Sequence, residues 1–210
     1  MIRILVADDH DIVRKGLKQI ISENADMVVA GEASNGEEAL ELVRAQDFDI
    51  AIIDIAMPGR GGLDILKDLR TGRPSLKIIV LSMYSEEQYA VRSLRDGASA
   101  YLTKANATDE LLKAIETVAG GKRYITPSVA ERLADYIEAD GSRLPHEGLS
   151  DRELQVLVKI GSGKSVSEIA ADLSLSLKTV STYRARLLEK MGMHSNAQIV
   201  KYVVQHELGQ

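Results

Sequence analysis

Five short apolar runs, each followed by a stretch with helical periodicity, fill the first 120 residues. The runs occupy residues 2–8, 27–33, 49–54, 77–82 and 98–103. The helical patterns occupy residues 11–23, 35–45, 61–71, 86–96 and 108–120. Strands and helices that alternate in this way predict an α/β domain with a five-stranded parallel, doubly wound sheet, whose helices cover both faces. The alternation alone leaves the strand order open.

The rest of the chain has a different pattern. Residues 128–139 have the apolar spacing of a short amphipathic helix, and Gly, Ser and Pro gather in residues 139–148, which predicts a linker. From residue 149 the pattern is purely helical. The four predicted helices run from a capping box at 150–153 to about 161, then over 166–173, 177–191 and 196–206. We therefore expect a first domain over 1–121, a linker with one helix over 122–148, and an all-α domain over 149–210.

Composition and charge limit the class of protein. No apolar run approaches the ~18 residues of a membrane span, and the chain has no cysteine, which excludes disulfides and thiolate metal sites. The N-terminus turns acidic within ten residues, unlike a signal peptide. We expect a cytoplasmic protein with no membrane partner. Residues 1–120 hold 14 basic and 20 acidic residues, whereas residues 149–210 hold 8 and 6. The basic C-terminal part suggests a nucleic-acid partner.

Polar side chains stand at the predicted carboxyl ends of four strands, which is where parallel α/β sheets bind ligands. They are Asp8 and Asp9 after the first strand, Asp54 after the third, Ser82 after the fourth and Lys104 after the fifth. An acidic pair after a strand is also common as a loop and helix cap, and a lone lysine is usually solvated. Together, however, three carboxylates and one ammonium leave two negative charges, which match one Mg²⁺ bound by oxygen ligands. The set predicts a site for a divalent cation and a phosphoryl group.

In this order, the residues resemble the CheY-like receiver domain of two-component response regulators. The resemblance spans residues 1–120 and extends to Met57-Pro58-Gly59, Gly62, Asp64 and Tyr101. It implies the strand order 2-1-3-4-5 and a phosphoryl group accepted on Asp54 from a sensor histidine kinase or a phosphotransfer protein. One departure is that Ala105 stands where receivers often have proline after the lysine.

The resemblance also implies a role for each site residue. Asp9, Asp54 and the main-chain carbonyl of Ala56 would hold Mg²⁺, with Asp8 reaching it through water. Lys104 would neutralise charge on the phosphoryl group. Ser82 would bind a phosphoryl oxygen and shift towards it, and Tyr101 would then turn inward as the second part of the switch.

The predicted helix over 177–191 is the most basic stretch of the chain. Residues 176–192 carry four basic side chains against Glu189. With the helix over 166–173 and the turn between them, this helix matches a helix-turn-helix. The residues expected to contact double-stranded DNA are Lys178, Thr179, Ser181, Thr182, Arg184 and Arg186. An ordinary three-helix core with a solvated face is the alternative interpretation of the same pattern.

The same region resembles the LuxR-type four-helix DNA-binding domain in its NarL/FixJ response-regulator setting. The matching elements are Leu149-Ser150-x-Arg152-Glu153, Glu168-Ile169-Ala170-x-x-Leu173, Lys178-Thr179-Val180 and Lys190-Met191. The family often has a basic residue where Ser181 stands. The resemblance implies a homodimer on an inverted-repeat operator, formed through part of the last helix, whose apolar residues are Ile199, Val200, Val203 and Val204. These residues could equally complete the domain core.

Two other functions fit parts of the sequence. An aspartyl-phosphate phosphohydrolase shares the nucleophile and the metal, but such enzymes usually carry Asp-x-Asp at the nucleophile, and residues 54–56 read Asp-Ile-Ala. The run Gly161-Ser-Gly-Lys-Ser165 looks like part of a P-loop, yet the position that should hold the first glycine is Val158, within a predicted helix. We therefore expect a transcriptional response regulator rather than an enzyme or a nucleotide-binding protein.

Overall fold

The computed structural model describes residues 1–83, 86–138, 144–206 and 208, so residues 139–143 of the predicted linker lie outside the described residues. The chain divides into two compact units, Met1–Leu133 and Ala134–Gln210. The division falls within one helix, α6 (Pro127–Glu138). The predicted domain boundaries at residues 121 and 149 stay predictions.

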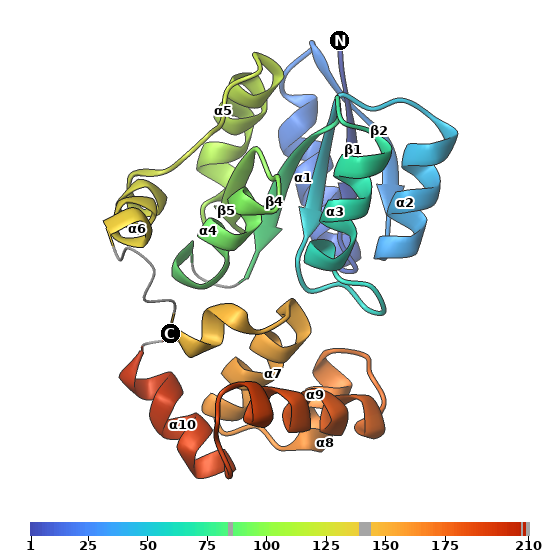
Figure 1. Ribbon diagram of the computed structural model, residues 1–210. Helices are drawn as coiled ribbons and strands as arrows, with labels where there is room; N and C mark the ends of the chain where they lie inside the picture. The colour runs from blue at the N-terminus through green and yellow to red at the C-terminus, as the bar shows by residue number, and fades with distance from the viewer. Residues whose placement is uncertain (84–85, 139–143, 207, 209–210) are drawn as a thin grey trace. The chain divides into compact units, whose positions relative to one another are not determined.

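The N-terminal unit is built on one parallel sheet (Figure 1). Its strands are β1 (Ile2–Ala7), β2 (Met27–Ala33), β3 (Ile50–Asp54), β4 (Lys77–Ser82) and β5 (Ala100–Thr103). Their order is β2-β1-β3-β4-β5, which confirms the predicted fold class and strand order. All five residues of β3 are buried, as expected for a central strand that is covered on both faces.

Helices cover both faces of this sheet. They are α1 (Asp11–Ser22), α2 (Gly36–Ala45), α3 (Gly62–Gly72), α4 (Glu86–Arg95) and α5 (Ala107–Ala119). Apolar residues of α1 and α5, such as Ile21 and Ile115, form one core cluster with Ile52 of β3. Helix α3 lies on the opposite face from α1 and packs against α2 (Figure 1). At its carboxyl end, each strand leads into a loop that precedes the next helix.

The unit continues beyond the predicted boundary at residue 121. The Tyr124 amide donates to the Ser99 carbonyl oxygen at 3.0 Å, and Tyr124 pairs with Ala100 of β5 as an isolated parallel bridge. Lys113 of α5 places its ammonium nitrogen 5.9 Å from the centre of the Tyr124 ring. The segment after α5 is thus bound to β5, the edge strand of the sheet. The pattern of strands and helices in the sequence did not predict this contact.

The C-terminal unit contains the four helices predicted after residue 149. After a short 3₁₀ turn (Pro145–Gly148) come α7 (Asp151–Gly161), α8 (Val166–Asp172), α9 (Leu177–Lys190) and α10 (Asn196–Gln205). Ser150 accepts from the Glu153 amide while the Glu153 carboxylate accepts from the Ser150 amide, so the predicted capping box is present. The core of this unit contains Leu157, Val180 and Ile199, all fully buried.

The sequence that resembles a P-loop has a packing explanation. Gly161 is the last residue of α7, where α10 crosses it: a Cβ atom at Gly161 would lie 2.4 Å from Cγ1 of Val203. Any side chain there would push the two helices apart. The end of a helix, rather than the strand that a phosphate-binding loop requires, precedes Lys164.

Candidate functional site

The carboxyl ends of the parallel strands bring the predicted acidic residues together. Asp54 ends β3 and Asp8 follows β1; each side chain is 1 % exposed. The backbone keeps the neighbouring strands in register, since the Lys104 amide donates to the Ser82 carbonyl oxygen at 2.7 Å. The ends of β1, β3, β4 and β5 therefore form one polar site on an otherwise apolar sheet.

Lys104 connects the two buried carboxylates. Its ammonium nitrogen lies 2.7 Å from Oδ2 of Asp8 and 2.8 Å from Oδ2 of Asp54. The remaining oxygens have backbone donors: Oδ1 of Asp54 accepts from the Ala56 amide at 3.2 Å, and Oδ1 of Asp8 accepts from the His10 amide at 2.8 Å. Buried carboxylates are tolerated when they are paired and hydrogen-bonded in this way.

The loop after β1 carries the exposed half of the site. Asp9 is 29 % exposed, and its Oδ1 lies 2.8 Å from Nδ1 of His10. Asp8, Asp9, His10 and Asp54 each offer one ligand atom, and these atoms lie within 4.8 Å of one another. Three carboxylates in this arrangement suit a hard divalent cation. His10 is an addition to the predicted set; only its position next to the acidic pair could have pointed to it.

Burial and charge together set the protonation of the site. Burial raises the pKa of Asp54 above its ordinary value, and the negative charge of Asp8 acts in the same direction, although Lys104 opposes both. Burial opposes the charged form of Lys104, but the Asp54 and Asp8 carboxylates outweigh it and raise the pKa of Lys104. The site therefore favours the ammonium form of Lys104, whereas it stabilises the charged form of Asp54 only partly.

Gly62 fixes the position of Asp54. A Cβ atom at Gly62 would lie 2.1 Å from the carbonyl oxygen of Asp54, so only glycine lets α3 begin this close to the end of β3. The Gly62 amide also donates to the Ile55 carbonyl oxygen at 3.1 Å. Asp64, in the first turn of α3, accepts from the Gly61 amide at 3.1 Å. The end of β3, and with it Asp54, is thus tied to the start of a helix.

The two residues predicted as the switch are both buried. Ser82 ends β4 and is 0 % exposed; Tyr101 in β5 is 1 % exposed and pairs with Val80. Both side chains therefore lie in the interior of the domain. The Lys104–Ala105 peptide bond is trans, since the described residues contain no cis bond.

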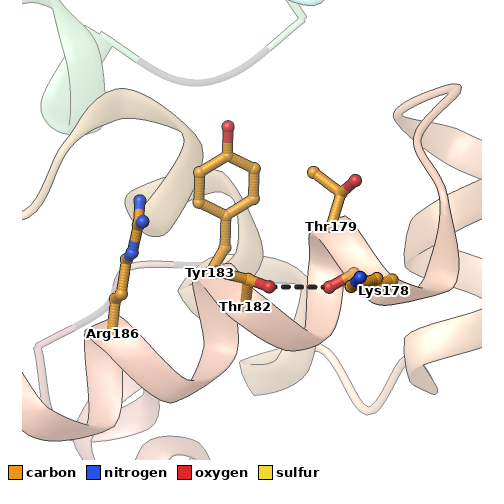
Figure 2. A pocket seen from close by; sticks show the side chains of 5 residues that line it. All are labelled: Lys178, Thr179, Thr182, Tyr183 and Arg186. Carbon is orange, nitrogen blue, oxygen red and sulfur yellow. Dashed lines mark hydrogen bonds between the residues drawn. The ribbon is translucent and has the colours of Figure 1, made fainter.

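In the C-terminal unit, one side of α9 carries a pocket of about 240 Å³ (Figure 2). It is lined by Lys178, Thr179, Thr182, Tyr183 and Arg186. Four of these belong to the predicted DNA contacts. Tyr183 is new: it is half-buried at the edge of the apolar stripe, and helical spacing alone did not show on which side of the stripe its ring lies.

The remaining predicted DNA contacts lie elsewhere on α9. Ser181 is exposed and outside the pocket lining. Arg184 is half-buried, and its Nε donates to Oδ1 of Asn196 at 2.7 Å, which ties α9 to the start of α10. Lys190 is also committed to the fold, because its ammonium nitrogen lies 2.6 Å from Oε2 of the buried Glu153. The structure thus separates the basic residues of α9 into two that hold the unit together and two, Lys178 and Arg186, that line the pocket.

The four apolar residues predicted for dimerisation do not share one face of α10. Ile199 and Val203 are 0 % and 3 % exposed and belong to the core of the unit. Val200 and Val204 are 37 % and 68 % exposed. The prediction is therefore corrected for Ile199 and Val203, which are already covered by α7; an amphipathic helix must bury one side within its own domain.

Family models match both parts of the chain. Residues 4–116 match the response regulator receiver domain, and residues 147–203 match the luxR family of bacterial regulatory proteins. The chain is a two-component response regulator of the NarL/FixJ type. It carries the receiver domain at its N-terminus and the LuxR-type helix-turn-helix at its C-terminus, and it regulates transcription.

Relatives of this response regulator match it along nearly its whole length. The response regulator UvrY of Escherichia coli K12 is 36 % identical over 209 residues, which cover 99 % of this chain and 96 % of UvrY. The response regulator GacA of Pseudomonas aeruginosa is 36 % identical over 207 residues, which cover 98 % of this chain and 97 % of GacA.

A solved relative has been captured on DNA. RcsB of Salmonella enterica serovar Typhimurium, bound to the promoter P1flhDC in the presence of the phosphomimetic BeF₃⁻, matches this response regulator with a TM-score of 0.66 and 28 % identity. The match covers 97 % of this chain and 98 % of that one. In the described parts of this response regulator, no helix is long and apolar enough to cross a membrane.

Proposed function

We propose that Asp54 accepts a phosphoryl group from a phosphohistidine of a sensor kinase or phosphotransfer protein, and that this controls DNA binding by α9. The observation that carries the proposal is the pairing of Lys104 with both Asp8 and Asp54 at the strand ends. A buried carboxylate with an ammonium group beside it, at an edge reachable from solvent, has the arrangement that phosphoryl acceptance requires.

The residues divide the chemistry among them. An oxygen of Asp54 attacks phosphorus, the bond from phosphorus to the donor's histidine nitrogen breaks, and the imidazole leaves with that electron pair. Lys104 neutralises charge on the phosphoryl oxygens, and the Ser82 hydroxyl donates to one of them. Asp8, Asp9 and Asp54 fit a divalent cation, and we propose that they hold Mg²⁺ together with the Ala56 carbonyl. When bound, Mg²⁺ supplies the positive charge that balances the carboxylates and the incoming phosphoryl group.

The switch follows from the positions of Ser82 and Tyr101. When the hydroxyl of Ser82 is drawn towards the phosphoryl group, the ring of Tyr101 turns into the space that it leaves. Because both residues are buried, the switch is a rearrangement inside the domain. The output is a homodimer on an inverted-repeat operator, with Lys178, Thr179, Ser181, Thr182 and Arg186 facing DNA and Val200 and Val204 facing the second copy. Since the target is double-stranded DNA, we place the protein in the cytoplasm.

The protein promotes only its own phosphorylation and the slow loss of its phosphoryl group. An aspartyl-phosphate phosphohydrolase needs an acid to assist turnover, and the residue two positions after Asp54 is Ala56. A steady-state phosphatase assay with Mg²⁺ separates the two functions: we expect turnover no faster than the slow loss of the phosphoryl group from Asp54. Turnover that is much faster than this loss would favour the hydrolase.

Labelling with acetyl phosphate and Mg²⁺, followed by intact-mass analysis, tests the acceptor. We expect one phosphoryl group on the wild type and none on Asp54→Asn, because the amide cannot form an acyl phosphate. Asp47→Asn is the matched control, since Asp47 is 84 % exposed and pairs with Arg73. Labelling of Asp54→Asn to the wild-type extent would remove Asp54 from the role.

A further inference from the structure

The pocket on α9 has a cationic side chain at each end and side chains with hydroxyl groups between them. Lys178 and Arg186 stand at its two ends, eight residues apart, which is about 12 Å along a helix. This span is close to the width of the major groove. Neither side chain has an ion pair within the described part of the chain, whereas Arg184 and Lys190 are held by Asn196 and Glu153. The two cations are thus available to a ligand at both ends of one pocket.

Between the cations the pocket is lined by two threonines and a tyrosine, which offer apolar groups as well as hydroxyls. Thr182 donates its hydroxyl to the Lys178 carbonyl oxygen at 2.9 Å, and Thr179 shares a hydrogen bond of 2.8 Å with the hydroxyl of Ser176. Both hydroxyls are therefore engaged within the helix, which leaves the two methyl groups for a ligand. Figure 2 shows the Tyr183 ring projecting from α9 between Thr179 and Arg186.

This chemistry matches one feature of a base-pair edge. In the major groove, the 5-methyl group of thymine is the apolar group on an edge otherwise made of hydrogen-bond donors and acceptors. Residues near the N-terminus of a recognition helix are those that reach base edges, and Thr179, Thr182 and Tyr183 are the third, sixth and seventh residues of α9. Cations at the ends of such a helix reach phosphates on the two sides of the groove.

We propose that Tyr183 is a specificity-determining residue, whose ring forms with the methyl groups of Thr179 and Thr182 a contact for the 5-methyl group of one thymine in each half-site. Lys178 and Arg186 hold the flanking phosphates and give affinity without sequence information. The inference rests on the proposed DNA binding by α9 and adds to it which base is recognised and by which residues.

The test begins with duplexes selected from a random pool by the full-length wild-type protein. Each thymine of the selected site is then replaced by deoxyuridine, which removes only the methyl group, and affinity is measured at several salt concentrations. We expect one position per half-site at which uracil weakens wild-type binding about fourfold, the value for one buried methyl group. Tyr183→Phe keeps the ring and should keep this loss, whereas Tyr183→Ala should bind thymine and uracil sites equally.

Two further variants keep the test decisive if Tyr183→Ala does not fold. Thr182→Ser removes one methyl group but keeps the hydroxyl that bonds to Lys178, and it should lower the uracil effect on an intact fold. Arg186→Ala should leave the uracil effect unchanged and make the salt dependence less steep by about 0.9, the slope that one neutralised phosphate adds.

The possible failures are distinguishable. A uracil effect of unchanged size in both Tyr183→Ala and Thr182→Ser, or none at any position in the wild type, would overturn the thymine contact while DNA binding stands. A weaker salt dependence in Tyr183→Phe would also overturn it, since the hydroxyl would then be contacting phosphate. If the wild type enriches no sequence and binds no DNA in a salt-dependent way, the proposed function itself fails together with this inference.

Discussion

The ammonium nitrogen of Lys104 lies 2.8 Å from Oδ2 of Asp54, although 50 residues separate them in the sequence. Strand order produces this contact, because β3 and β5 both pair with β4 and end on the same edge. The lysine is shared with Asp8, so it balances only one of two buried negative charges. The site is therefore short of positive charge, and this deficit governs its stability and its affinity for cations.

Replacing Asp54 with asparagine should stabilise the metal-free receiver domain at neutral pH. Burial raises the pKa of Asp54 above the ordinary 3.8, so the folded state binds its proton more tightly than the unfolded state. The group's contribution to stability is then fully present below pH 3.8 and is lost as pH rises through the raised pKa. Asp54→Asn removes this loss and leaves Lys104 paired with Asp8. Calorimetry in EDTA, with Asp47→Asn as control, should show a higher melting temperature; a lower one would contradict the argument.

Asp9→Ala should weaken Mg²⁺ binding by more than about tenfold, because it removes an oxygen ligand from the solvent side of the site. Titration calorimetry with MgCl₂ measures the affinity directly. Asp26→Ala is the matched control, since Asp26 is an exposed carboxylate just before β2, at the opposite edge of the sheet. Equal Mg²⁺ affinity in the Asp9 variant and the wild type would remove Asp9 from the metal site.

Arg184 and Arg186 should have different effects despite being two residues apart. Arg184→Ala breaks the hydrogen bond to Asn196 and should lower the stability of the C-terminal unit by about 1 kcal/mol. Arg186→Ala should leave stability within about 0.5 kcal/mol, since nothing in the described part of the chain pairs with it, and should weaken binding to any duplex. Unfolding curves and retardation on random-sequence DNA separate the two; equal losses of stability would refute the distinction.

The Glu153–Lys190 pair should make the C-terminal unit sensitive to acid. Although burial opposes it, the hydrogen bonds from Lys190 and Ser150 lower the pKa of Glu153 below the ordinary 4.5. The stabilisation is therefore present above pH 4.5 and is lost as pH falls through the lowered value. Glu153→Gln should cost about 1 kcal/mol at about pH 7, a figure reduced because Lys190 is half exposed. In strong acid the variant and the wild type should have the same free energy of unfolding. A difference in this free energy that stays constant across pH would mean that the carboxylate charge does not contribute.

Substitutions at Val204 and Ile199 should distinguish an effect on dimerisation from an effect on folding. Val204→Asp places a charge on a side chain that is 68 % exposed, so we expect a folded protein that binds a single half-site normally and a two-half-site duplex without cooperativity. Ile199→Asp places a charge in the core and should unfold the C-terminal unit. Sedimentation on duplexes of one and two half-sites gives the readout. Undiminished cooperativity in Val204→Asp would exclude this face as the contact between copies.

Much of the fold was predictable, because the spacing of apolar residues, and the points at which that spacing changes, are local properties of the chain. Each strand was predicted within two residues of its observed ends, and Asp8, Asp54 and Lys104 meet because parallel strands share a carboxyl edge. The strand order came from the family resemblance, since a run of apolar residues carries no information about its neighbours in the sheet.

Contacts between elements were what the sequence could not show. Helical spacing placed Arg184 among the outward residues, but it could not show that Asn196 would lie within 2.7 Å of it. Likewise, the spacing of α10 showed an apolar stripe without showing that Ile199 and Val203 are covered by α7. The same limit hid Tyr183, a half-buried residue that lines the pocket.

The different roles of the basic residues of α9 have an evolutionary consequence. Arg184 and Lys190 hold the helix in place, whereas Lys178, Thr179 and Arg186 have side chains that no other helix of the described chain requires. A duplicated copy of this gene could therefore acquire a new set of promoters by exchanging a few residues around the pocket, while its fold and its phosphorylation chemistry stayed unchanged. For the same reason, Lys178, Thr179 and Arg186 are the positions to randomise when this response regulator is to be redirected to a different promoter.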